Sequence, residues 1–145
     1  MKSLARTAGD LLAPLPGNAG EKTLSTLVDT PRDVRKTVLH LTPSIGGGGA
    51  EAMLRNLVTT MDPTVWRSVI VTVDGRRWPE AAQRLRAGGA EVHDLEADAF
   101  LRPNTLFRMI RLIRKIQPDV VQTWMHHADF VGGWCAQMAG VRRVI

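Results

Sequence analysis

The chain has 145 residues, of which 44% are hydrophobic and 23% charged, which fits one domain with enough apolar residues for a core. No stretch approaches the roughly 18 to 20 uninterrupted apolar residues of a membrane span, so an integral membrane protein is excluded. The net charge of +5 favours an acidic partner without choosing its class. Cys135 is the only cysteine, which excludes an internal disulfide and fits a cytoplasmic location.

Residues 1–35 differ in composition from the rest. They contain three prolines, are rich in small and polar residues, and have no sustained hydrophobic period. We interpret them as a mobile extension before a domain that occupies residues 36–145.

From residue 36 onward, short β-branched runs alternate with helical patterns. The pattern predicts strands over 37–42, 66–73, 90–95 and 119–124, helices over 50–61, 79–87, 103–116 and 128–139, and the start of a fifth strand at 142–145. This alternation predicts an α/β fold, a doubly wound, Rossmann-like parallel sheet in the order 3-2-1-4-5. The first and fourth strands are then neighbours, and the loops at their carboxyl ends flank one crevice.

The first of these loops holds four consecutive glycines, Gly46 to Gly49, directly before a helix. We interpret all four as serving close approach of a ligand rather than packing, since the free N–H groups of the next helix favour a phosphate. A G-x-G-x-x-G fingerprint starting at Gly46 fails, because Glu51 stands at its third glycine, and a P-loop would need a lysine. For Glu51, complementing the helix dipole and contacting substrate are equally open.

The loop after the fourth strand holds the adjacent His126 and His127. Either imidazole could hydrogen-bond a sugar hydroxyl or help place a proton, and polar loop filler is the simpler alternative. Asp129 fits a helix cap. His40 and His93 lie on other strands without ligand spacing, so no metal is expected.

The helix over 106–116 has a basic face beside its apolar one. Such helices normally flank a parallel sheet with their charges in solvent. Peripheral contact with an anionic membrane through Arg108, Arg111 and Arg114 is the alternative.

Two segments carry a resemblance to a known family. They are 38–51, with the glycine loop, and 118–129, with the histidine pair; Gly132-Gly133 and Ala139-Gly140-Val141 add to them. Together they closely resemble the N-terminal domain of GT-B retaining glycosyltransferases of family 4.

The resemblance implies transfer of a sugar from a nucleotide-sugar donor to a glycan or lipid-linked acceptor, as in polysaccharide biosynthesis. It implies retained configuration, no cofactor and no nucleic-acid partner. His127 matches the family histidine near the reaction centre, and Gly47, Gly48 and Gly49 match the loop that closes over the donor. Glu51 and His126 complete the expected donor-binding set, although His126 departs from the tyrosine often found there.

The family's second Rossmann-like domain has no counterpart here. The expectation is therefore a truncated hexosyltransferase, cytoplasmic or at the inner face of the plasma membrane, and inactive alone. Two other classes stay open: a Rossmann-type oxidoreductase or epimerase, which would bind a dinucleotide, and a non-catalytic module that binds anionic lipid or another acidic partner.

Overall fold

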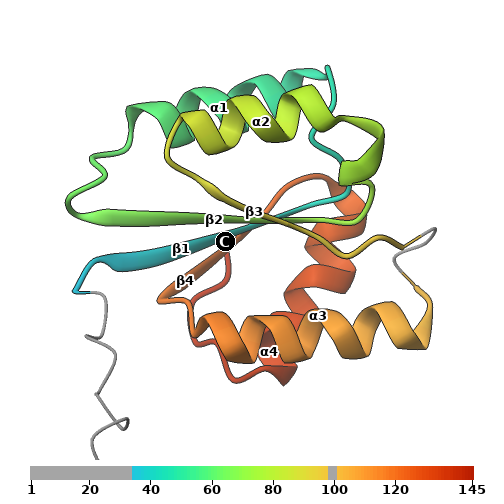
Figure 1. Cartoon of the computed structure of the whole chain (residues 1–145). Coiled ribbons are helices and arrows are strands. Elements are labelled where there is room, and N and C mark those ends of the chain that lie inside the picture. The colour runs from blue at the N-terminus through green and yellow to red at the C-terminus, as the bar shows by residue number, and fades with distance from the viewer. Residues whose placement is uncertain (1–33, 98–100) are drawn as a thin grey trace, which may run out of the picture. The chain divides into compact units, whose positions relative to one another are not determined.

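Four parallel strands in the order β3-β2-β1-β4 form the centre of the computed structural model, which describes residues 34–97 and 101–145 (Figure 1). The strands are β1 (Lys36–Thr42), β2 (Trp66–Thr72), β3 (Glu91–Asp94) and β4 (Val120–Thr123). β1 pairs with β2 on one side and with β4 on the other. The predicted α/β fold, a doubly wound and Rossmann-like parallel sheet, is confirmed.

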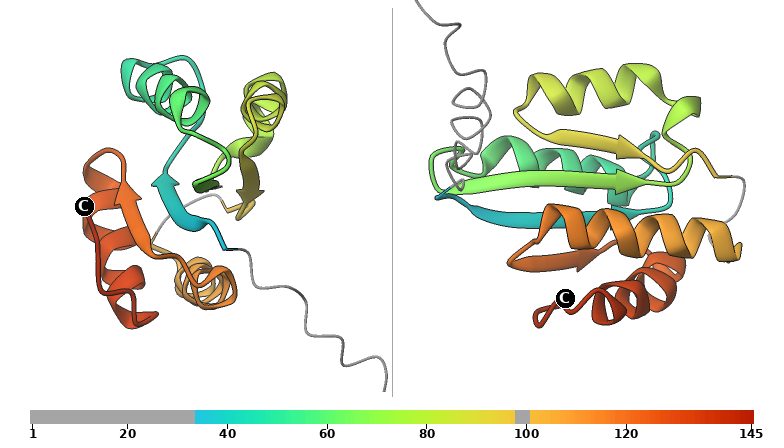
Figure 2. Two further views of the ribbon diagram at one scale, coloured as in Figure 1. Left: turned by 90° about the vertical axis from the view of Figure 1, so that its left-hand side faces the viewer. Right: turned by 60° about the horizontal axis from the view of Figure 1, so that its bottom comes forward.

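Two helices cover each face of the sheet (Figure 2). On one face lie α1 (Gly49–Thr60) and α2 (Pro79–Ala87); on the other lie α3 (Pro103–Ile116) and α4 (Gly133–Met138). Particular residues in the sequence determine where several of these helices begin and end. Proline opens α2 and α3, where its missing N–H costs nothing, and a left-handed Gln117 with φ of 50° closes α3.

The core has two layers because side chains alternate along each strand. Leu39 and Leu41 pack with Met109 and Ile113 of α3, whereas Ile70 packs with α1 and α2 on the opposite face. β1 is therefore covered on both faces as well as paired on both edges. This accounts for the continuous buried run along it.

The end of the chain differs in detail from the prediction. The helix expected over 128–139 starts earlier, with helical backbone at His126 and His127, and passes through one π-helical turn, η2 (Ala128–Gly132), before α4. Gly132 is packed so closely that an added β-carbon would lie 2.9 Å from Cδ1 of Leu41, which places this turn directly on β1. The fifth strand begins beside β4 as expected, through a parallel bridge between Val121 and Val144.

Two further predictions concern the N-terminal extension and membrane-spanning helices. The extension expected over residues 1–35 lies almost entirely outside the described residues, so its mobility stays a prediction. Among the described residues, no helix combines the length and apolar character that crossing a membrane requires.

One polar side chain lies within this core. His40 of β1 is fully buried opposite Gln122 of β4, and its Nδ1 accepts a hydrogen bond of 3.4 Å from the indole N–H of Trp124. Its Nε2 has no hydrogen-bond partner among the described residues. Burial lowers the pKa of the imidazole to about 4, an effect that the neighbouring Gln122 amide offsets in part.

Stability should fall in mild acid because His40 is buried in its neutral form. Its pKa is 6.5 without burial and about 4 in the fold, so the unfolded chain takes up the proton first as the pH drops. The stability from this group is complete above pH 6.5 and is lost progressively towards pH 4. We expect a loss of about 2 kcal/mol in unfolding free energy between pH 7 and pH 5.

Urea denaturation of the wild-type chain and His40→Leu at both pH values measures this component. The variant should lack it, whatever its stability at pH 7. Equal pH dependence in the two proteins would contradict the assignment.

Candidate functional site

The topological switch point of the sheet lies between β1 and β4. The paired residues of β1 and β4 extend from Val38 opposite Val120 to Leu41 opposite Thr123. The two strands lead into α1 and α4, which lie on opposite faces of the sheet. The Trp124 backbone N–H also donates to the Leu41 carbonyl at 2.9 Å. Ligands of open α/β sheets bind at such a point, beyond the carboxyl ends of the strands. The loops after β1 and β4 are thus neighbours, as predicted.

The loop after β1 is held in shape by its own polar groups. The Thr42 hydroxyl donates to the Ser44 carbonyl at 2.7 Å, and the Gly46 N–H donates to the Ser44 hydroxyl at 3.1 Å. The first helical bond of α1 runs from the Ala52 N–H to the Gly48 carbonyl, at 3.0 Å. The N–H groups of residues 49–51 precede that bond and have no partner within the helix.

The four glycines have different surroundings, which corrects the interpretation that none serves packing. A β-carbon added to Gly46 would lie 2.6 Å from the Trp78 indole, so the absence of a side chain at Gly46 allows the indole to pack against the loop. One added to Gly48 would meet the Glu51 carboxylate. Gly47 and Gly49 face open space, with nothing within 4 Å of an added β-carbon. These two glycines leave room for the close approach of a ligand, and the predicted ligand-binding roles of Gly47, Gly48 and Gly49 stay predictions.

Glu51 lies in the first turn of α1, and its carboxylate turns back over Gly48. A negative charge there is stabilised by the helix dipole, which agrees with one of its two predicted roles. Contact with substrate stays a prediction.

A second loop meets the glycine loop at this edge, and none of its residues was among the predicted site residues. Asp74 follows β2, and its N–H donates to the Pro43 carbonyl at 3.3 Å. The one-turn 3₁₀ helix η1 (Gly75–Arg77) comes next. The Arg77 guanidinium lies 3.6 Å from the Asp74 carboxylate, and that of Arg76 lies 2.5 Å from Glu96. Asp74 is thus a half-exposed acid at the end of the strand next to the glycine loop.

The open glycines also define a sequence register that the prediction did not test. Read from Gly47, the residues Gly47, Gly49 and Ala52 fit G-x-G-x-x-A, a form of the dinucleotide fingerprint with alanine last. The fingerprint expects an acid roughly 20 residues further on, and Asp74 stands in that region. That spacing was the available signal for Asp74.

The loop after β4 carries the predicted histidines. Met125 has φ of 73°, a left-handed conformation uncommon for a side chain of this size. His126, His127 and Asp129 follow it at the surface, and neither imidazole makes a hydrogen bond within the described residues. The structure therefore places both histidines at the switch point without orienting them. The catalytic role of His127 and the binding role of His126 stay predictions.

No group of three or more histidine, cysteine or acidic side chains in the described part of the chain could hold a metal ion. Cys135 is buried in α4, and this burial raises the pKa of its thiol to about 11 because it disfavours the charged thiolate. A thiol held protonated in this way is a poor nucleophile.

Comparison with known proteins gives no family. No protein-family model and no curated protein matches the chain. Among solved structures it is similar to L-sorbose reductase from Gluconobacter frateurii, which was solved in complex with NADPH and L-sorbose. The two are 18% identical with a TM-score of 0.40, over 61% of this chain and 33% of the reductase. The chain thus spans about a third of that protein, and a likeness of this extent defines neither ligand nor reaction.

These findings overturn the predicted family. No family model matches, and the similar solved structure described above is an NADPH-bound reductase rather than a GT-B enzyme. Membership of glycosyltransferase family 4, sugar transfer from a nucleotide-sugar donor to a glycan or lipid-linked acceptor, and the expectation of no cofactor are therefore wrong. The physical reason is that any open parallel sheet with the strand order 3-2-1-4 brings the loops after its first and fourth strands together at the switch point. The glycine loop and the histidine segment therefore indicate this arrangement of the sheet and not a particular reaction.

The different roles of the glycines are testable through stability. Gly46→Ala should lower the unfolding free energy by about 1 kcal/mol, because its methyl group displaces the Trp78 indole. Gly49→Ala, at the first position of α1 with open space around it, should be neutral or stabilising. In a Trp78→Ala background the cost of Gly46→Ala should disappear. Equal costs in both backgrounds would remove the contact as the cause.

Proposed function

We propose that this chain binds an adenine dinucleotide of the NAD or NADP class at the carboxyl edge of its sheet. The observation that carries the proposal is the open space over Gly47 and Gly49, at the start of α1 and beside the switch point. A diphosphate is the group that such a turn accommodates, because N–H donors and the positive end of the helix dipole converge there.

The neighbouring loop supplies the second part of the argument. Dinucleotide folds use an acid at the end of the following strand to accept hydrogen bonds from ribose hydroxyls. Asp74 has that position, and its backbone bond to Pro43 fixes it relative to the glycine turn. Arg76 and Arg77 stand beside it as cations that could meet a further phosphate.

One feature opposes an anionic ligand. The Glu51 carboxylate lies over Gly48, where it would repel a diphosphate. Nothing among the described residues bonds this side chain, so it can turn into solvent at low cost. The site thus fits the cofactor after one side-chain movement. When bound, a nicotinamide cofactor supplies hydride transfer, and the residues named here would bind and orient it.

Filling the open space should weaken binding strongly and leave the fold intact. Gly47→Val and Gly49→Val each place methyl groups where the diphosphate would lie, so we expect at least a tenfold loss of affinity for NADPH and NADH by isothermal titration calorimetry. Thr60→Val, at the far end of α1, is the matched control and should bind as the wild type does. Unchanged affinity in both glycine variants, or no binding by the wild-type chain at millimolar ligand, would refute the proposal.

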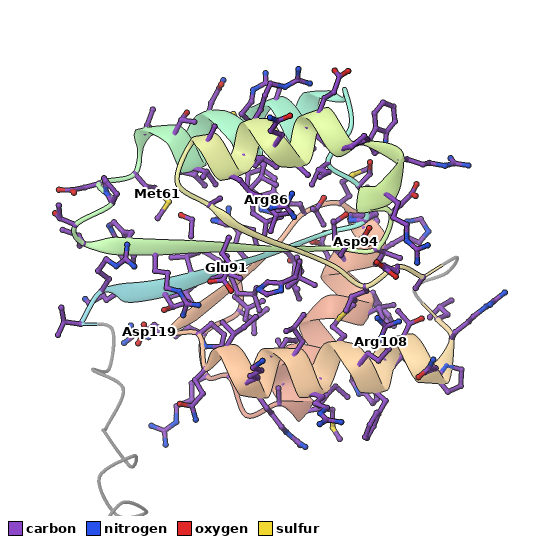
Figure 3. All side chains as sticks on the ribbon, viewed as in Figure 1. Met61, Arg86, Glu91, Asp94, Arg108 and Asp119 are labelled. Atoms are coloured by element: carbon purple, nitrogen blue, oxygen red, sulfur yellow. The ribbon has the colours of Figure 1, made fainter. Side chains whose placement is uncertain are left out.

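A second candidate function is peripheral contact with an anionic membrane through α3. This helix has no acidic residue, and Phe107 projects from it with 66% of its surface exposed. Arg108, Arg111 and Lys115 follow one stripe at i, i+3 and i+7 and make no ion pair within the described residues. The stripe borders a groove of about 320 Å³ whose other wall includes Asp94 of β3 (Figure 3). Each cation near an anionic surface contributes about 1 kcal/mol.

Charge reversal tests this second candidate. Arg108→Glu/Arg111→Glu/Lys115→Glu should abolish co-sedimentation with vesicles containing phosphatidylserine. Arg114 is spared because its guanidinium donates to the Met138 carbonyl at 2.9 Å and ties α3 to α4. Arg55→Glu/Arg142→Glu/Arg143→Glu changes the charge equally and should retain binding. Equal loss in the two triple variants would leave only an effect of net charge.

A further inference from the structure

We propose that the indole of Trp78 is the platform on which the purine base of the ligand stacks. The inference rests on the proposed dinucleotide site and names the residue that would recognise the adenine end.

The placement of Trp78 is unusual for so large an apolar side chain. The indole packs directly against Gly46, whose missing β-carbon makes room for it, yet 42% of the residue remains exposed. Its backbone is fixed at both ends, since its N–H donates to Gly75 and its carbonyl accepts from Ala82, each at 3.0 Å. The ring is therefore held at the rim of the glycine loop with part of its surface open to solvent.

The surroundings match what a base requires. In a nucleotide the base is joined to the ribose, so a base platform must lie near the group that holds the ribose. Asp74 and Trp78 flank η1, and both loops that carry this region meet at Pro43 and Gly46. Base–aromatic stacking is tolerant of base identity and contributes through area, which an exposed indole provides.

The other three tryptophans are placed for different tasks. Trp66 opens β2 at the opposite edge of the sheet, with the Lys36 ammonium 5.9 Å from its ring. Trp124 packs against the core and donates to His40. Trp134 projects from α4, half-exposed and outside both loops of the site. Trp78 alone among the four lies against the glycine loop.

The test compares ligands with and without a base. Affinities for ADP and for inorganic pyrophosphate are measured by calorimetry for the wild type, Trp78→Ala, Trp78→Phe and the control Trp134→Ala. Trp78→Ala should weaken ADP binding by about tenfold or more and leave pyrophosphate binding unchanged. Trp78→Phe should restore most of the loss, and Trp134→Ala should behave as the wild type.

The two proposals fail in different ways. If the wild-type chain binds ADP and NADPH but Trp78→Ala binds ADP equally well, the stacking role is wrong and the dinucleotide site stands. Parallel loss of ADP and pyrophosphate binding in Trp78→Ala would mean that the indole only supports the loop, and would also overturn the inference. If the wild type binds none of these ligands, the dinucleotide site itself is wrong.

Discussion

The parallel pairing of β1 with β4 is the constraint on which the rest of the structure depends. β1 is hydrogen-bonded on both edges and buried on both faces, so its position is fixed by the whole sheet. Because β1 and β4 run in the same direction, their carboxyl ends open at one edge, and their helices diverge to opposite faces. The meeting of the glycine loop and the loop that carries His126 and His127 at one edge of the sheet follows from this one pairing.

Close packing then gives the edge its detailed shape. Gly132 allows the π turn to lie on Leu41, and Gly46 allows the Trp78 indole to lie on the loop after β1. Both contacts use a missing side chain to bring two elements together. They leave Gly47 and Gly49 as the unfilled part of the loop. A run of four identical residues thus contains one packing contact, one position facing a carboxylate and two open positions.

Much of the fold could be predicted because its signals are local. The helix 79–87 was predicted to the residue, since Pro79 and Gly88 mark its ends. The observed strand order is the common doubly wound order that was expected for alternating strands and helices. The π turn, the bond from Asp74 to Pro43 and the packing of Trp78 on Gly46 could not be predicted, because each joins residues distant in sequence or depends on space left by a neighbour.

The function was harder to predict for the same reason. Four consecutive glycines allow more than one register of a fingerprint, and only the space around each glycine distinguishes them. His126 and His127 were predicted to be catalytic or ligand-binding residues because of their place in the fold. Their side chains are exposed and have no hydrogen bonds within the described residues. Position at a switch point predicts where a ligand binds, whereas its identity depends on contacts that patterns do not contain.

The most direct test of the central claim is a titration of the ¹⁵N-labelled chain with NADPH, followed through the backbone amide resonances. The dinucleotide site predicts saturable shifts concentrated at residues 47–52 and 74–78. Saturable shifts confined to the basic stripe of α3, or no saturable shifts at all, would contradict it.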